Sequence, residues 1–171
     1  MQTNKNIILC GFMGCGKTTV GKLLAEKTGR QFIDTDHAIE SDSSMSISQI
    51  FEKYGESYFR DLETSLCSKL AQKKRCVIST GGGLILNSVN AALLKQNGLI
   101  VLLDVNVQEI FRRIGGDKSR PLLNSDDSAG AIDKLYRERL PKYMDACDIV
   151  LNGEKSPSSI VNDIIRVISK S

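Results

Sequence analysis

Residues 11–18 read Gly11-Phe12-Met13-Gly14-Cys15-Gly16-Lys17-Thr18 and follow the pattern G-x-x-x-x-G-K-T of a phosphate-binding loop. An apolar run at residues 7–10 leads into this stretch, and the apolar spacing after it predicts a helix over residues 17–28. A glycine-rich turn with a chance Lys-Thr pair would not require a strand and a helix on either side. The stretch therefore predicts a strand–loop–helix unit that binds a nucleoside phosphate.

The residue types of this loop suit phosphate binding. Glycines let backbone N–H groups turn toward phosphate oxygens, and the N-terminus of the following helix favours negative charge. Lys17 has the length to reach the β- and γ-phosphates, and the Thr18 hydroxyl suits Mg²⁺. The residues that we assign to the nucleotide in this loop are Gly11, Gly14, Cys15, Gly16, Lys17, Thr18 and Thr19.

Composition narrows the class of protein. A chain of 171 residues with 41% hydrophobic and 25% charged residues fits one globular domain. Its net charge of +3 is too small to indicate a nucleic-acid partner, and no apolar run is long enough to span a membrane. The first residues lead directly into an expected strand, which leaves no room for a signal peptide. Five scattered cysteines without a C-x-x-C pair favour reduced thiols, so we expect a cytoplasmic protein. Separately, we expect it to be a monomer.

Short apolar runs alternate with helical patterns along the whole chain. The expected strands cover residues 7–10, 31–34, 77–79, 99–103 and 149–151. The expected helices cover residues 17–28, 46–54, 57–72, 88–96, 107–114, 131–145 and 157–169. This alternation predicts an α/β fold with a parallel sheet covered on both faces, and an active site at the carboxyl ends of the strands.

Two regions depart from simple strand–helix crossovers. Residues 37–72 hold two expected helices between the second and third strands, and residues 115–128 are polar and lack periodicity. The first region suits a substrate-binding subdomain and the second suits a lid. We expect both to belong to a single domain of residues 1–171.

Two carboxylates, Asp34 and Asp36, follow the second expected strand. Side chains two residues apart at a strand end lie on the same side. Beside a phosphate loop, one carboxylate suits a Mg²⁺ ion and the other suits a substrate hydroxyl group. The alternative is a solvated acidic turn.

A run of three glycines follows the third expected strand, in the sequence Thr80-Gly81-Gly82-Gly83. Glycines at a strand end permit close approach of the backbone to a ligand. A plain tight turn rarely needs all three, so the run favours a ligand-binding turn.

Arg60 and Arg139 each have a partner at helical spacing. Arg60 and Glu63 are i, i+3 neighbours, which fits either a carboxylate that aims the guanidinium or an ordinary surface pair. Arg139 and Tyr143 are i, i+4 neighbours and share a helix face. Pro141 lies between them, and a proline inside a helix suggests a role in shaping a site.

More arginines surround the polar segment at residues 115–128. Arg112 and Arg113 precede it, and Arg120 lies within it. Arg120 could be an arginine that closes over a triphosphate, or it could belong to a solvated basic loop without such a role.

In combination these motifs resemble those of the shikimate kinase family, among the phosphate-loop kinases related to nucleoside-monophosphate kinases. They run in order through nearly the whole chain. They are G-x-x-G-x-G-K-T at 11–18, D-T-D at 34–36, G-E-x-x-F-R-x-x-E at 55–63, G-G-G at 81–83, R-R-x-G-G with R-P-L at 112–122 and R-x-P-x-Y at 139–143. The phosphate loop alone is unspecific, whereas the combination is highly specific.

The resemblance implies a three-layer α/β/α sandwich of the phosphate-loop NTPase type, with a five-stranded parallel sheet of order 2-3-1-4-5. It implies an ATP-dependent kinase that phosphorylates the 3-hydroxyl of shikimate, giving shikimate 3-phosphate and ADP in aromatic amino-acid biosynthesis. The implied partners are the small molecules shikimate and ATP, with Mg²⁺ as the cofactor. The adenine of ATP would lie between Arg113 and Pro157.

The resemblance also implies roles for the charged residues. Arg60 and Arg139 would bind the shikimate carboxylate, which suits planar, forked guanidinium groups. Asp36 would bind ring hydroxyls and orient the attacking hydroxyl as a catalytic residue. The remaining wall of this pocket would be the backbone of Gly81, Gly82 and Gly83.

The same resemblance assigns the groups around the phosphates. Thr18 and Asp34 would hold Mg²⁺. Lys17 and Arg120 would be catalytic, because they would neutralise the phosphoryl group in transfer.

Cys15 stands where the family more often has a small polar or aliphatic residue. Loop amides and Lys17 create a positive field that favours a thiolate, which predicts fast alkylation that ATP blocks. The alternative is a side chain that points into the core beneath the loop and is inert.

Two other functions fit part of the sequence. Another small-metabolite kinase, acting on gluconate or a nucleoside monophosphate, would share the phosphate loop and a similar charge pattern. A nucleotide switch protein would carry a guanine-reading N-K-x-D element, and the only Asn-Lys pair, Asn4-Lys5, precedes the first expected strand. The sequence therefore favours a kinase, and shikimate as its acceptor.

Overall fold

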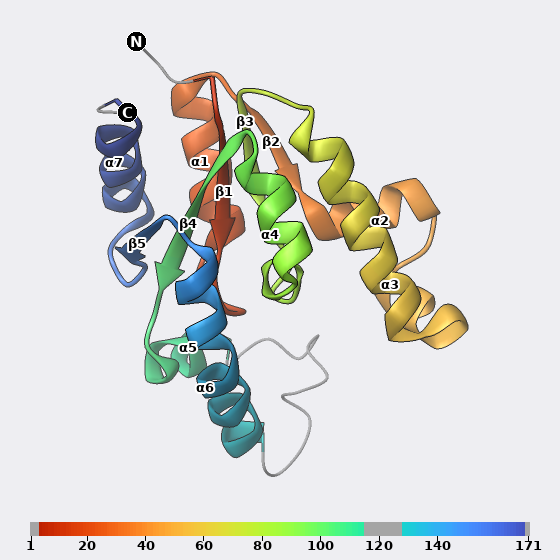
Figure 1. Cartoon of the computed structure of the whole chain (residues 1–171). Helices are drawn as coiled ribbons and strands as arrows, with labels where there is room; N and C mark the ends of the chain where they lie inside the picture. The colour runs from red at the N-terminus through yellow and green to blue at the C-terminus, as the bar shows by residue number, and fades with distance from the viewer. Residues whose placement is uncertain (1–3, 115–127, 170–171) are drawn as a thin grey trace.

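The computed structural model describes residues 4–114 and 128–169, which form a parallel sheet with helices on both faces (Figure 1). The strands in these residues are β1 (Asn6–Cys10), β2 (Gln31–Asp34), β3 (Cys76–Ser79), β4 (Gly98–Asp104) and β5 (Ile149–Asn152). They lie in the order β2-β3-β1-β4-β5, and all neighbours are parallel. The expected sheet order is therefore confirmed.

The helices form the outer two layers. They are α1 (Lys17–Thr28), α2 (Thr35–Ser43), α3 (Ile47–Ala71), α4 (Ser88–Lys95), α5 (Val107–Ile114), α6 (Ser128–Ala146) and α7 (Pro157–Ile168), with a short 3-10 turn η1 (Leu84–Leu86). Helix α1 packs against α7 and the sheet, whereas α4 packs against α3 and β4 on the other face (Figure 1). This arrangement confirms the three-layer α/β/α sandwich.

The central strand β1 fixes the position of the phosphate loop. Ile7, Ile8, Leu9 and Cys10 are all 0% exposed, as expected for a parallel strand covered on both faces. In-register neighbours flank it on both sides, with Ile8 opposite Ile78 of β3 and Ile100 of β4. The loop at residues 11–16 therefore begins from a strand that is fully buried and paired on both sides.

One local feature differs from the sequence prediction, and a second confirms it. Residues 35–43 form helix α2, which the sequence analysis does not predict. The helix begins here because the Asp34 carboxylate accepts hydrogen bonds from the backbone N–H groups of Asp36 at 3.1 Å and His37 at 3.4 Å. A carboxylate that caps these N–H groups stabilises a helix that begins at the next residue. The two helices expected over residues 46–54 and 57–72 are confirmed as two helical segments of α3 that meet at Gly55, whose φ of 82° is non-helical.

The cap also corrects the expected geometry of the two carboxylates. Asp34 ends β2, but Asp36 lies in the first turn of α2, so the two are not alternate residues of one strand. Both still reach the same hollow, because the helix begins directly at the carboxyl edge of the sheet.

Within the described part of the chain, none of the helices has both the length and the apolar character needed to cross a bilayer.

Candidate active site

The phosphate loop has a backbone geometry that requires its glycines. Gly11, Gly14 and Gly16 have φ angles of 139°, 75° and 93°, in the region that side chains with a Cβ rarely adopt. A Cβ on Gly14 would also lie 2.6 Å from Cγ2 of Ile114, at the end of α5. The motif glycines are therefore needed for both the turn and its packing.

Lys17 is held inside this loop. Its ammonium group donates to the carbonyl oxygens of Gly11 at 2.8 Å and Phe12 at 2.9 Å, and lies 3.5 Å from Sγ of Cys15. These bonds hold a positive charge at the centre of the loop, and none of the carboxylates in residues 4–114 and 128–169 forms an ion pair with it. The charge is thus available to a phosphate group.

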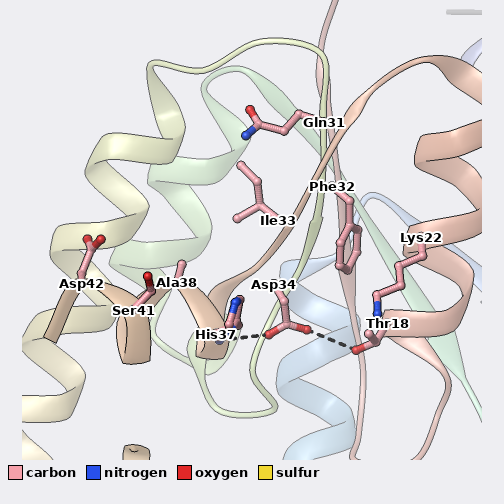
Figure 2. A pocket seen from close by; sticks show the side chains of 10 residues that line it. All are labelled: Thr18, Lys22, Gln31, Phe32, Ile33, Asp34, His37, Ala38, Ser41 and Asp42. Atoms are coloured by element: carbon pink, nitrogen blue, oxygen red, sulfur yellow. Dashed lines mark hydrogen bonds between the residues drawn. The ribbon is translucent and has the colours of Figure 1, made fainter. Parts of the chain in front are cut away.

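Thr18 and Asp34 come together beside the loop. The Thr18 hydroxyl donates to Oδ2 of Asp34 at 3.2 Å and lies 3.5 Å from the Ser79 hydroxyl. Figure 2 shows the Asp34 carboxylate between Thr18 and the start of α2 at His37. Hydroxyl and carboxylate oxygens are the hard ligands that Mg²⁺ prefers, so this pair fits that ion.

Two hollows meet at Thr18 and Asp34. A pocket of about 700 Å³ lies on the outer side of β2, where Figure 2 shows Lys22, Phe32 and His37 around it. A smaller pocket of about 370 Å³ is lined by the phosphate loop, Asp36, the start of the glycine run and Arg113. The smaller pocket is the candidate active site, because it combines the phosphate-binding groups with a carboxylate and an open backbone turn.

Asp36 lies against the glycine run. A Cβ on Gly81 would collide with the Asp36 carboxylate, so only glycine permits this approach. Burial raises the pKa of Asp36, and the neighbouring Asp34 charge raises it further, while Lys17 lowers it. The carboxyl group is therefore a better proton acceptor than an exposed aspartate would be.

Arg60 reaches the other end of the glycine run from α3. A Cβ on Gly83 would lie 2.6 Å from Nη1 of Arg60. The guanidinium donates to Glu63 at 2.8 Å and to Glu56 at 2.9 Å. Glu63 is 1% exposed, so the expected carboxylate that aims the guanidinium is present and the surface-pair alternative does not hold.

Arg139 and Tyr143 approach the middle of the run from α6. A Cβ on Gly82 would lie 3.6 Å from Nη1 of Arg139 and 3.8 Å from Oη of Tyr143. The Tyr143 hydroxyl donates to the Gly82 carbonyl at 2.5 Å, and the side chain is 1% exposed. Burial raises the pKa of Tyr143, so it stays a neutral hydrogen-bond donor.

Arg113 lies between the phosphate loop and the end of the sheet. It donates to Glu109 at 2.7 Å, to the Cys15 carbonyl at 3.4 Å and to the Gly153 carbonyl at 3.1 Å. Pro157 is exposed at the start of α7, four residues after Gly153. The structure thus places Arg113 at the candidate pocket but gives no direct contact between Arg113 and Pro157.

Some expected residues lie outside the described part of the chain. Arg120 is one of them, as is nearly all of the expected lid at residues 115–128.

Several groups at the site were not singled out from the sequence. Thr35 accepts a hydrogen bond from the Gly81 N–H at 2.8 Å, and Ser79 lies near Thr18. No spacing rule points to these two residues. Glu109 did carry a signal, because it lies three and four residues before Arg112 and Arg113 and pairs with both.

A parallel sheet of this order, with a phosphate loop after its central strand and a pocket beside that loop, is typical of phosphate-loop kinases. A model of the shikimate kinase family matches residues 13–169. The chain belongs to the shikimate kinase family.

Individual relatives cover nearly the full length of the chain. A shikimate kinase of Persephonella marina is 46% identical over 162 residues, which are 94% of this chain and 97% of the relative. A solved shikimate kinase of Acinetobacter baumannii, in complex with shikimate, has a TM-score of 0.90 at 38% identity and covers 99% of this chain and 95% of that one. The shikimate kinase of Aquifex aeolicus has a TM-score of 0.84 at 39% identity, covering 96% of each chain.

The fold extends to more distant kinases. A gluconokinase of Sinorhizobium meliloti has a TM-score of 0.60 at 12% identity, covering 99% of this chain and 94% of that one. That likeness concerns the fold alone.

The buried position of Cys15 leads to a prediction about alkylation. Cys15 is 1% exposed and Cys10 is 0% exposed, whereas Cys147 is half-buried. We expect brief treatment with iodoacetamide to modify Cys147 first and Cys15 no faster than Cys10, with or without Mg²⁺-ATP. Peptide mapping measures the order, and denatured protein provides the control in which all cysteines react. Fast labelling of Cys15 that ATP suppresses would instead indicate a reactive loop thiol.

The raised pKa of Asp36 leads to a prediction about stability. A carboxyl group whose pKa is higher in the folded state favours folding when protonated, and this contribution is lost as the pH rises through the folded pKa. The variant Asp36→Asn should therefore unfold a few degrees above the wild type at pH 7, where 1 kcal/mol corresponds to roughly 2–4 °C. The difference should shrink as the pH falls.

Thermal unfolding at pH 7 and at a pH below the usual range of aspartate measures this difference. Asp61→Asn is the matched control, because Asp61 is exposed on α3 and should change the unfolding temperature little at either pH. A variant Asp36→Asn that is less stable than the wild type at pH 7 would contradict the prediction.

Proposed function

We propose that this chain transfers the γ-phosphoryl group of ATP to the 3-hydroxyl of shikimate, giving shikimate 3-phosphate and ADP in aromatic amino-acid biosynthesis. The observation that carries the proposal is the convergence of Asp36, Arg60 and Arg139 on one glycine run beside the phosphate loop. The family membership of the chain supports the same reaction.

The acceptor fits the charges along the glycine run. Shikimate carries one carboxylate and three ring hydroxyls. Arg60 and Arg139 supply guanidinium groups for the carboxylate, and the backbone of Gly81, Gly82 and Gly83 provides a wall without side chains. Asp36 lies at the opposite end of the run from Arg60, where it would meet the hydroxyls.

Asp36 would orient the attacking hydroxyl and accept its proton. Its raised pKa makes the carboxylate a stronger base than an exposed aspartate. Phosphoryl transfer depends mainly on positioning and charge neutralisation, so orientation is the larger part of this role.

Lys17 and Arg120 would neutralise the phosphoryl group in transfer. The Lys17 ammonium lies at the centre of the loop and would exchange its bonds to two carbonyl groups for phosphate oxygens. The role of Arg120 rests on the sequence motif alone.

Arg113 and Pro157 would hold the adenine between them. Arg113 is fixed beside the loop by Glu109, and a planar guanidinium suits stacking on a base. The rest of the nucleotide site would consist of Gly11, Gly14, Cys15, Gly16, Thr18 and Thr19.

Thr18 and Asp34 would hold Mg²⁺, because their oxygens face each other at 3.2 Å beside the phosphate loop. The ion supplies positive charge that neutralises the phosphate oxygens when it is bound. Thr18 also has the Ser79 hydroxyl nearby, which keeps its own hydroxyl directed to this side of the loop.

We further propose that residues 1–171 form one kinase domain that acts as a monomer. Residues 37–72 would be its substrate subdomain and residues 115–128 its lid. We place the protein in the cytoplasm, because ATP is available there and the five free cysteines stay reduced.

A competition assay tests the acceptor. We expect ATP-dependent ADP release with shikimate, and release at least ~10²-fold lower in kcat/KM with gluconate or AMP, because a site built for particular hydrogen bonds rejects acceptors that leave them unpaired. A coupled ADP assay with the three acceptors at equal concentrations measures this order. Preference for gluconate or AMP would assign the chain to another metabolite kinase.

The two arginines should affect one substrate only. Arg60→Ala and Arg139→Ala should each weaken shikimate binding by roughly 2–5 kcal/mol, because each removes one partner of a desolvated charge pair. ATP binding should stay within about twofold, since neither residue lies at the phosphate loop. Titration calorimetry with each substrate separates the two effects.

The matched control is Arg137→Ala, which removes an exposed arginine of α6 whose ion pair, within the described part of the chain, is with Asp133. It should change neither affinity. A loss of ATP affinity in Arg60→Ala or Arg139→Ala, with shikimate affinity unchanged, would contradict the assignment of these arginines.

A further inference from the structure

A buried polar bridge joins the helix that carries Arg60 to the end of the glycine run. The Thr64 hydroxyl of α3 donates to Oδ1 of Asn90 in α4 at 2.8 Å. Nδ2 of Asn90 donates in turn to the Leu84 carbonyl at 3.1 Å. Asn90 is 1% exposed, and Leu84 directly follows Gly83.

The direction of each hydrogen bond is fixed by its partners. The Leu84 carbonyl is only an acceptor, so the Asn90 amide must present its NH₂ group there and its oxygen to Thr64. The Thr64 hydroxyl has one hydrogen and two acceptors in reach, Asn90 at 2.8 Å and the Arg60 carbonyl at 3.2 Å. The nearer acceptor lies in another helix, so the hydroxyl links two elements instead of bonding only within α3.

An asparagine at this position is costly for folding unless both bonds form. Asparagine is a weak helix former, and burial of an amide without hydrogen bonds destabilises the folded state. Its neighbours on the buried side of α4, Ala91 and Leu94, are apolar. The polar residue in an otherwise apolar row therefore indicates a specific geometric role.

The bridge spans the two structures that set the position of the acceptor carboxylate. Thr64 lies one helical turn after Arg60, and Leu84 lies one residue after Gly83, which the Arg60 guanidinium contacts. Helices α3 and α4 run side by side between these two points (Figure 1). A change in the bridge would shift α3 relative to the glycine run and move the guanidinium with it.

We propose that Asn90, together with Thr64, is a positioning residue that fixes the distance between the Arg60 guanidinium and the glycine run, and thereby sets the affinity for a carboxylate-bearing acceptor. The proposal rests on the proposed function, because it takes Arg60 as the carboxylate-binding group. Neither Thr64 nor Asn90 lines the candidate pocket itself.

Matched substitutions at Thr64 test the bridge. Thr64→Val keeps the shape but removes the hydroxyl, whereas Thr64→Ser keeps the hydroxyl. We expect Thr64→Val to raise KM for shikimate about tenfold, with kcat and KM for ATP changed less than about twofold, because a shift below 1 Å at a binding group is costly. Thr64→Ser should restore KM to within about twofold of the wild type.

Thr28→Val is the control for loss of a buried hydroxyl. The Thr28 hydroxyl donates to the Leu24 carbonyl of its own helix, α1, and among the described residues it links to no second element. This variant should lower the unfolding temperature without changing KM for shikimate. An unchanged KM in Thr64→Val, with only a lower unfolding temperature, would show that the bridge is merely structural and overturn the proposal.

A double-mutant cycle separates positioning through Arg60 from any other effect. In an Arg60→Lys background, Thr64→Val should raise KM for shikimate by less than about twofold, because the planar guanidinium that the bridge positions is gone. A full tenfold rise in that background would overturn the proposal. If Thr64→Val does not fold, Asn90→Asp tests the same bridge. This substitution keeps the acceptor for Thr64 and replaces the donor to Leu84. An unchanged KM for shikimate in Asn90→Asp would likewise overturn the proposal.

The proposed function is tested separately by the wild-type protein. If the wild type does not phosphorylate shikimate, the proposed function fails before any variant is compared. If the wild type does so and Thr64→Val behaves as the wild type, only the positioning role fails.

Discussion

Two glycines determine where charge can lie along the glycine run beside the candidate pocket. The Asp36 carboxylate occupies the space where Gly81 would otherwise carry a Cβ, and a Cβ on Gly83 would lie 2.6 Å from the Arg60 guanidinium. A carboxylate and a guanidinium thus rest against bare backbone at the two ends of one short run. A ligand with a carboxylate at one end and hydroxyls at the other matches this order of charges. A side chain on either glycine would displace the charged group, so the charges would no longer match such a ligand.

The same run is tied to the strand that carries the phosphate loop. The Thr80 N–H and hydroxyl both donate to the Leu9 carbonyl of β1, at 3.0 Å and 3.1 Å. Thr35 and Tyr143 bind the run at Gly81 and Gly82 from two other helices. Because β1 continues directly into the phosphate loop, one strand sets the distance between this loop and the glycine run, where we propose that the two substrates bind. A reaction that depends on alignment of donor and acceptor benefits from such a fixed frame.

The sequence predicts the sheet and the loop well, because both follow from local patterns. Continuous apolar runs identify the buried strands, and the motif at residues 11–18 identifies the loop with its helix. It does not predict helix α2, since that helix depends on Asp34 turning its carboxylate back onto two N–H groups. It also does not predict the Thr64–Asn90 bridge or the Thr35 contact, because these join residues 26 and 46 positions apart. Such contacts arise from tertiary packing, and local spacing rules in the sequence do not predict them.

The two carboxylates around Arg60 differ in a way that suits exchange with a ligand. Glu63 is 1% exposed and is held by Arg60 at 2.8 Å, so removal of that partner would leave a buried charge unpaired. The Glu56 side chain is 64% exposed, and a pair of that kind contributes only about 0–1 kcal/mol. A ligand carboxylate can therefore replace Glu56 on Arg60 at small cost in free energy, while Glu63 keeps the guanidinium in the same orientation. The buried partner provides direction, and the exposed partner occupies guanidinium donors that a carboxylate ligand would need under the proposed function.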